Sequence, residues 1–241
     1  MNLSTTVTKY VRKGMVFGIW LFVWQVGYWI VGKSALVPSP LSTLLTLGQM
    51  ACEKAFYMHL GATFWRVVVG MTLSFGGAIL LVLPSYKYQW VKVLFEPMIA
   101  FMKSTPIMAI IILALLWFES DWVPIFVCIL MCYPIIYTNL LTGLGTLDHE
   151  LKELNQVYHV KKALVIRKCY WPQLYPYVAA SLQLGIGMAW KVVIAAEVLA
   201  IPKYAIGEAL MNAKVYIETR EVFAWVVVII LISQICEHAM V

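Results

Sequence analysis

The sequence predicts an all-α integral membrane protein, and three observations lead to this class. Hydrophobic residues make up 62% of the 241 residues, charged residues only 12%, and the mean hydropathy is +0.83. A soluble domain of this size cannot bury so much apolar surface. Several uncharged runs also approach the roughly 20 residues that cross about 30 Å of hydrocarbon, where backbone polar groups must be satisfied internally. We therefore expect these runs to be helices.

About six transmembrane helices are expected in a single domain that comprises residues 1–241. Their expected limits are 15–31, 63–83, 93–118, 123–144, 177–199 and 222–236. The third span should be interrupted at Ser104, Thr105 and Pro106, because a proline inside a helix removes a backbone hydrogen bond. Gly185 and Gly187 should allow a neighbouring helix to approach the fifth span closely.

Basic residues predict the orientation of the spans. They gather before the first span, between the second and third spans, and between the fourth and fifth spans: Lys9, Arg12, Lys13, Lys87, Lys92, Lys152, Lys161, Lys162, Arg167 and Lys168. The turn between the third and fourth spans is acidic, with Glu119 and Asp121. Since basic loops stay on the cytoplasmic side, we expect both termini to be cytoplasmic. The same bias explains the formal charge of +6 without a nucleic-acid partner.

The sequence lacks the common motifs of nucleotide binding, zinc proteases and serine hydrolases. It contains no G-x-x-x-x-G-K-[ST], H-E-x-x-H or G-x-S-x-G pattern, so we expect neither a catalytic residue nor a bound cofactor or metal in this chain. Cys128 and Cys132 are four residues apart on an apolar span, where small packing residues are more common than ligands. His59 is expected in an extracytoplasmic loop as a solvated surface residue. A membrane-embedded enzyme is therefore the third-ranked interpretation.

Residues 147–171 form a polar segment between the fourth and fifth spans. Apolar side chains at Leu147, Leu151, Leu154 and Tyr158 recur at helical spacing, and a second helical stretch is expected over 161–170. Pro172 should open the next span. Periodicity alone leaves two interpretations open, an amphipathic helix in the membrane interface or a docking element for a cytoplasmic protein.

The spacing of this segment resembles the EAA loop of the permease subunits of bacterial binding-protein-dependent ABC importers. Glu153, Leu154 and Asn155 are followed after three residues by His159, and after nine more by Cys169, Tyr170, Trp171 and Pro172. Four other pieces resemble the nitrate/sulfonate/taurine group of these permeases in order and spacing: residues 36–40 (LVPSP), 103–106 (KSTP), 116–118 (LWF) and 189–197 (AWKVVIAAE).

The resemblance implies a type I ABC importer permease fold in the bacterial inner membrane. It implies a separate ATPase subunit that holds ATP-Mg, an extracytoplasmic substrate-binding protein, and a homodimer or a pair with a similar permease. The residues that would contact the ATPase are Glu153, Leu154, Asn155, Tyr158, His159 and Pro172. Leu154 and Asn155 depart from the family's paired alanines, and His159 replaces the loop glycine, a change that histidine tolerates at a conformational cost. The expected solute is small and polar or anionic, such as a sulfonate, nitrate, bicarbonate or a vitamin precursor.

Polar residues at membrane depth are the candidates for the translocation pathway, because they are costly to place there. We single out Lys103 beside the break at Pro106, and Lys191 and Glu197 in the fifth span. Lys103 could instead extend to the membrane interface, and the other two could form structural pairs. Lys191 and Glu197 are about 240° apart around a helix, so they should not face each other.

Arg66 is expected as an interface anchor or structural partner.

The alternative function is a self-contained secondary transporter or channel, which would show internal repeats and its own coupling-ion site.

Overall fold

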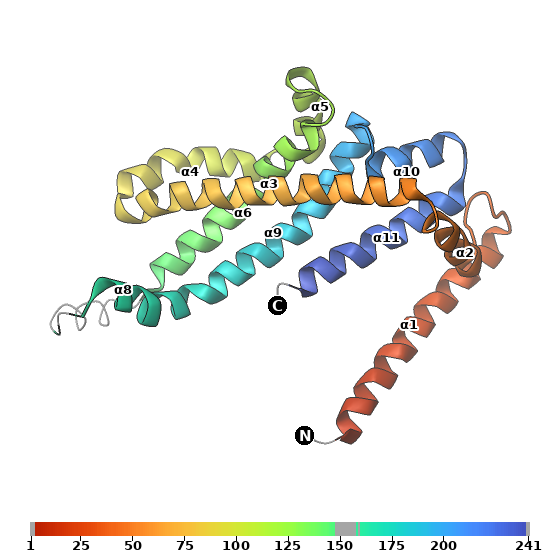
Figure 1. The fold of residues 1–241 in the computed structure, drawn as a ribbon, viewed down its shortest axis with the longest axis horizontal. Coiled ribbons are helices and arrows are strands. Elements are labelled where there is room, and N and C mark those ends of the chain that lie inside the picture. Colours follow the sequence, from red (N-terminus) through yellow and green to blue (C-terminus); the bar gives the residue numbers. More distant parts are fainter. Residues whose placement is uncertain (1–2, 148–157, 159, 240–241) are drawn as a thin grey trace.

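The computed structural model describes residues 3–147, 158 and 160–239, and these residues contain helices and no strand (Figure 1). Five helical segments are long and apolar enough to cross a membrane: α1 (Leu3–Val31), α3 (Lys54–Lys87), α6 (Val123–Gly145), α9 (Trp171–Ala200) and α11 (Thr219–His238). A sixth is obtained if the bent pair of α4 (Gln89–Ser104) and α5 (Ile107–Trp117) counts as one span. The all-α membrane class and the expected number of spans are confirmed.

The break between α4 and α5 lies where the sequence places it. The backbone N–H of Thr105 donates to the carbonyl of Phe101 at 3.0 Å, and Pro106 then starts α5 in an extended conformation. The two helices diverge by 103°, so residues 93–118 do not cross as one straight helix. Figure 1 shows α5 projecting sideways from the bundle.

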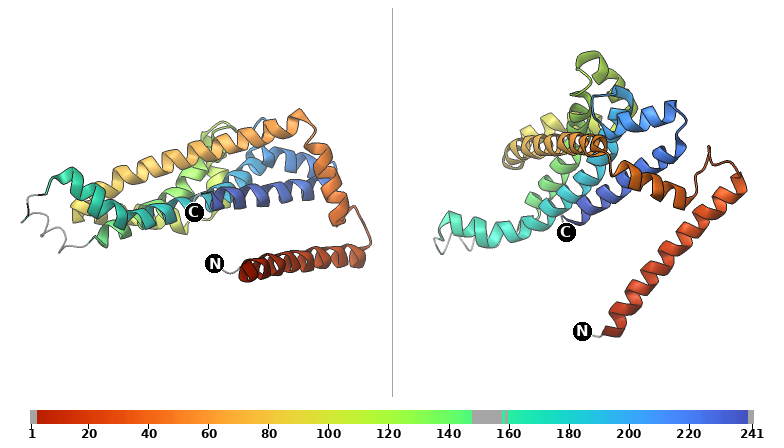
Figure 2. Two further views of the ribbon diagram at one scale, coloured as in Figure 1. Left: turned by 60° about the horizontal axis from the view of Figure 1, so that its bottom comes forward. Right: turned by 45° about the vertical axis from the view of Figure 1, so that its right-hand side comes forward.

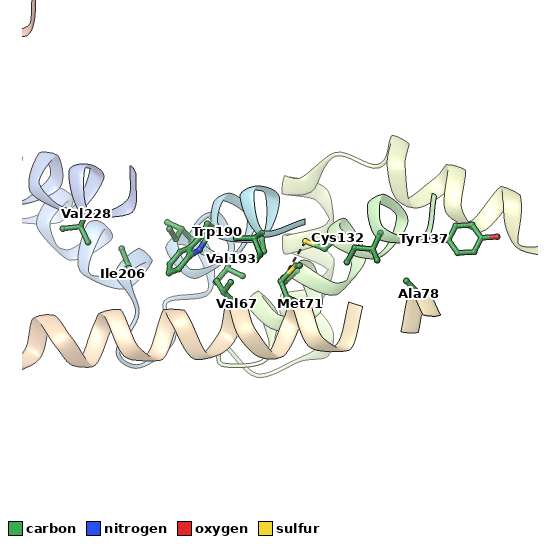
Figure 3. Close-up of a cluster of buried hydrophobic side chains, with 14 of the residues drawn as sticks. Val67, Met71, Ala78, Cys132, Tyr137, Trp190, Val193, Ile206 and Val228 are labelled. Atoms are coloured by element: carbon green, nitrogen blue, oxygen red, sulfur yellow. Dashed lines mark hydrogen bonds between the residues drawn. The ribbon is translucent and has the colours of Figure 1, made fainter. Parts of the chain in front are cut away.

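Three helices form the packed centre of the molecule. α6 contacts both α3 and α9 along most of its length, and two hydrophobic clusters fill the spaces between the helices. Figure 3 shows part of the larger cluster. A Cβ added at Gly70 would lie 2.6 Å from Cys128 Sγ, and one at Gly185 would lie 2.8 Å from Met71 Cε. These glycines therefore permit the close helix approach that was expected for Gly185. At Gly187, the space of a Cβ is taken by the Glu237 carboxylate.

α1 stands apart from this centre, as both views of Figure 2 show. None of its apolar window is buried, and it is held near its C-terminal end. There Trp24 donates from Nε1 to the Pro38 carbonyl at 3.1 Å and stacks on Phe223 of α11. Ser39 then caps α2 (Pro40–Met50) by accepting from the backbone N–H of Ser42.

Three helical segments extend beyond the expected spans. α2 and α10 (Ile206–Val215) were not predicted, and α3 begins at Lys54 rather than at residue 63. α2 and α10 have 11 and 10 residues, too few to cross about 30 Å of hydrocarbon, so a search for membrane-length runs passes over them.

The bundle has two ends, which we name after the short helices there. At the α8 end, α8 (Lys162–Val165) and a π-helical turn, η1 (Ile166–Tyr170), lead directly into α9 (Figure 1). This confirms a helical stretch over 161–170 and the opening of the next span at Pro172. At the α10 end lie α2, α10 and the turn between α5 and α6.

Candidate functional site

The segment expected to contact an ATPase is placed in part. Glu153, Leu154, Asn155 and His159 lie outside the described residues, so their roles stay predictions. Tyr158 is described, and 73% of its surface is exposed. Pro172 is the second residue of α9, where a proline costs no intrahelical hydrogen bond.

The helical turns that follow present apolar and basic side chains together. Leu164 and Ile166 are exposed, and so are Lys161, Arg167 and Lys168 around them. Val165 is buried. A single helical turn that exposes this much apolar surface beside cations is typical of a segment that is covered by another molecule.

The two candidate lysines have exposed side chains. Lys103 lies in the last turn of α4 and Lys191 lies in α9, and neither forms an ion pair within the described residues. Lys191 is nine residues from the end of α9 at Ala200, which is about 14 Å along the helix. Pro106 is also exposed, at the corner between α4 and α5.

Glu197 has a different environment from Lys191, as their helical spacing predicts. It is fully buried, and its two carboxylate oxygens accept three hydrogen bonds. Oε1 accepts from Arg66 at 3.0 Å, and Oε2 accepts from the Thr63 hydroxyl at 2.9 Å and from the Gly207 backbone N–H at 3.2 Å. The structure therefore contains the structural pairing that was the alternative to a pathway role.

Arg66 is the centre of this cluster. Its Nη1 donates to Glu197 and to the Tyr204 carbonyl, and its Nη2 donates to Asp121 at 2.7 Å and to the Lys203 carbonyl at 3.2 Å. Only 6% of Arg66 is exposed, whereas 61% of the Asp121 side chain is. A planar guanidinium can serve four acceptors at once, which a lysine cannot do.

Sequence reasoning identified Arg66 as a possible structural partner but did not connect it with Glu197 or Thr63. A usable signal was present, because two opposite charges on apolar spans are each costly alone and favourable only as a pair. The separation of 131 residues between them hides this pairing from local patterns.

His59 corrects one expectation. It lies in α3 rather than in a loop, and only 16% of its side chain is exposed. Its Nδ1 is 3.0 Å from the Ala205 carbonyl and 3.3 Å from Glu208 Oε2, and its ring packs edge-on against Trp225. The residue belongs to the contact between α3 and α10, because α3 starts about two and a half turns earlier than the apolar run.

The buried cysteines are packing residues. The Sγ atoms of Cys128 and Cys132 are 4.0 Å apart, and Cys132 also contacts the Gly185 carbonyl. Throughout the described part of the chain, no three His, Cys, Asp or Glu side chains lie close enough together to hold a metal ion.

An apolar cavity of about 500 Å³ lies between α3, α9 and the C-terminal end of α11. Phe64, Met71, Phe75 and Trp190 contribute most of its large side chains, and no charged residue lines it. Within the described residues, the indole N–H of Trp190 has no hydrogen-bond partner. A cavity of this kind does not suit an anion, which needs cations or N–H donors when it leaves water.

The fold is that of a multi-pass membrane protein that exposes a short apolar and basic helical surface at one end. The chain belongs to the family of binding-protein-dependent transport system inner membrane components, which its residues 70–236 match. The chain is therefore a permease of the ABC importer type, and the resemblance drawn from the sequence is confirmed.

Relatives with named transport roles are similar to most of this chain. A Bacillus subtilis protein named as an aliphatic sulfonates transport permease is 24% identical over 93% of this chain and 82% of its own length. The nitrate import permease of Synechocystis is 24% identical, with 79% and 72% covered. The formylaminopyrimidine transport permease of Halalkalibacterium halodurans is 25% identical, with 73% and 70% covered.

Proposed function

We propose that this chain is the membrane-spanning subunit of an ATP-driven importer and forms the solute pathway by alternating access. Two copies, or one copy with a similar permease, enclose the pathway. A separate ATPase holds ATP-Mg and docks at the α8 end, and a substrate-binding protein delivers solute at the α10 end. The observation that carries the proposal is the family match, which extends over α6, the segment before α9, and α9 itself.

The connection between α8 and α9 supports a mechanical role for the segment before α9. α8, η1 and α9 follow one another without a loop, so a displacement of α8 acts directly on a helix of 30 residues, about 45 Å long. Because α9 packs against α6 and α3, these helices respond as a group. Glu153, Leu154, Asn155, Tyr158 and His159 are proposed to fill the groove on the ATPase.

The exposed lysines support a pathway that runs along α9 and the α4–α5 corner. A lysine at membrane depth is costly in lipid, so an exposed lysine with no ion pair among the described residues favours a surface that faces water or a second protein. We assign Lys191 and Lys103 to that wet surface, with Pro106 providing the corner that brings Lys103 there. For Glu197, the contacts favour an indirect role, through the position of the pathway helices.

The proposed solute is small and polar or anionic. Two lysines on the pathway surface favour an anion such as a sulfonate, nitrate or bicarbonate, and the named roles of the relatives include a sulfonate and nitrate. A vitamin precursor is the other class, which the pyrimidine-transporting relative supports. The α8 end is proposed to be cytoplasmic, with both termini on that side.

The first experiment is affinity purification of the tagged chain from its native membrane in mild detergent. We expect stoichiometric recovery of an ATPase with a P-loop, and loss of this ATPase in a Glu153→Ala, Leu154→Ala double variant. A Leu116→Ala, Glu119→Ala double variant is the matched control at the opposite end and should retain the ATPase. Recovery of the chain alone, also after cross-linking, would contradict the proposal and favour a self-contained transporter.

A further inference from the structure

The start of α10 is capped by side chains from two other helices. Its own N-cap residue, Ala205, has no side chain that can accept a hydrogen bond. Instead, Thr63 of α3 accepts from the Ile206 N–H at 2.9 Å, and Glu197 of α9 accepts from the Gly207 N–H at 3.2 Å. The carboxylate also lies at the positive end of the helix dipole of α10, where a negative charge is favourable.

The approach between α9 and α10 depends on Gly207. A Cβ at this position would collide with the Cβ of Glu197 and would lie 2.5 Å from the backbone nitrogen of Val198. Because a backbone atom cannot move aside cheaply, a larger residue would separate the two helices. The carboxylate can therefore reach the first turn of α10 only because residue 207 has no side chain.

Arg66 holds the connection between α9 and α10. It donates to the carbonyls of Lys203 and Tyr204 and neutralises Glu197. This connection contains two residues with positive φ, Ile201 at 48° and Tyr204 at 53°. A branched residue such as isoleucine adopts this conformation only where surrounding contacts impose it.

We propose that Thr63, Arg66 and Glu197 form a clamp that makes α10 part of one rigid body with α3 and α9. These three residues are positioning residues rather than solute ligands. The second part of the inference rests on the proposed function: during transport, α10 moves together with α3 and α9, so the α10 end of the pathway opens and closes with those helices and not by an independent motion of α10.

The first test measures how firmly α10 is held, in the purified chain alone. Spin labels are introduced as unnatural amino acids at position 80 of α3 and position 214 of α10, both of which carry exposed side chains, so the native cysteines stay in place. We expect one narrow distance distribution. Thr63→Val, which keeps the shape but removes both hydrogen bonds of the hydroxyl, should lose this single narrow peak, and Thr63→Ser should restore it.

A matched control separates the clamp from a general effect on α3. Thr72→Val makes the same change on the same helix at a hydroxyl that only donates to the Val68 carbonyl, so the distribution should stay narrow. Arg66→Lys keeps the charge but cannot serve four acceptors, and it should broaden the peak in the same way as Thr63→Val. If the peak stays narrow in both clamp variants, the clamp does not hold α10 and the proposal is wrong.

The second test uses the complex with its ATPase in two states, without nucleotide and with a non-hydrolysable ATP analogue. The distance between positions 80 and 214 should be the same in both states. A shift between the states, with the clamp intact, would show that α10 moves independently and would overturn the rigid-body inference. Failure of any ATPase to bind would instead contradict the proposed function, while the first test would still decide on the clamp.

Discussion

At the α10 end, α9 finishes inside a network of buried side chains that satisfy one another, whereas at the α8 end it begins in turns whose apolar and basic side chains are exposed. Glu197 accepts three hydrogen bonds from its own chain. The side chains of Leu164 and Ile166 are instead exposed. The comparison teaches that the same helix joins a part whose polar groups satisfy one another within the chain to a part whose apolar side chains are exposed.

This difference predicts that charge removal at the α10 end has the largest effect on stability. Glu197→Leu removes the buried carboxylate that pairs with Arg66, leaving Asp121 as its carboxylate partner, and it removes the acceptor of Thr63 and of the Gly207 N–H. Breaking a buried ion pair in this way should lower the free energy of unfolding by about 3–5 kcal/mol. Unfolding of the purified chain by denaturant in detergent micelles measures it.

The control for this variant is Glu119→Leu, which removes an exposed carboxylate at the same end. Its unfolding free energy should change by less than about 0.5 kcal/mol. Equal losses of unfolding free energy in Glu197→Leu and Glu119→Leu would show that the buried network contributes no more to stability than one exposed carboxylate.

A smaller loss of stability is expected from Gly207→Ala. The added methyl meets Glu197 and the α9 backbone, and overpacking of this kind costs about 1–3 kcal/mol. Gly61→Ala in α3 is the control, because a Cβ there meets no atom within 4 Å. That substitution should instead stabilise the chain by about 0.5–1 kcal/mol, since alanine favours a helix. Thermal unfolding of both variants in one detergent tests the difference in sign.

The smallest effect on stability is expected at the α8 end. A Leu164→Ser, Ile166→Ser double variant removes exposed apolar surface, so its unfolding free energy should stay within about 0.5 kcal/mol of the parent. Recovery of the ATPase with the tagged chain should nevertheless be lost. Val215→Ser, an exposed apolar residue at the α10 end, is the control and should retain it. If the Leu164→Ser, Ile166→Ser variant lost as much unfolding free energy as Glu197→Leu, the two ends would not differ in stability as we expect.

The sequence predicted those parts of the fold that depend on local physics. The break before Pro106 follows from a missing N–H, and the start of α9 beside Pro172 follows from the preference of proline for a first helical turn. The long spans follow from hydropathy. α2 and α10 were missed because a helix of 10 or 11 residues needs no long apolar run. The start of α10 is instead held by contacts of Thr63 and Glu197, which are distant in the sequence.

The candidate site was predicted less completely, for a related reason. Lys191 was placed on a different face from Glu197 by helical spacing alone, and the structure agrees. The clamp joins residues from α3, α9 and α10, and only three-dimensional packing shows that these positions meet. His59 was misplaced because α3 begins at Lys54, before its apolar stretch, and hydropathy does not mark these first residues as helical.

The π-helical turn η1 has a consequence for insertions and deletions. A π turn accommodates one more residue than an α turn without turning the flanking helical segments onto new faces. Removal of a single residue between Ile166 and Tyr170 should convert η1 into an ordinary α turn while Leu164 keeps its direction relative to α9. The chain can therefore change its length by one residue at this position during evolution and still present Leu164 on the same face.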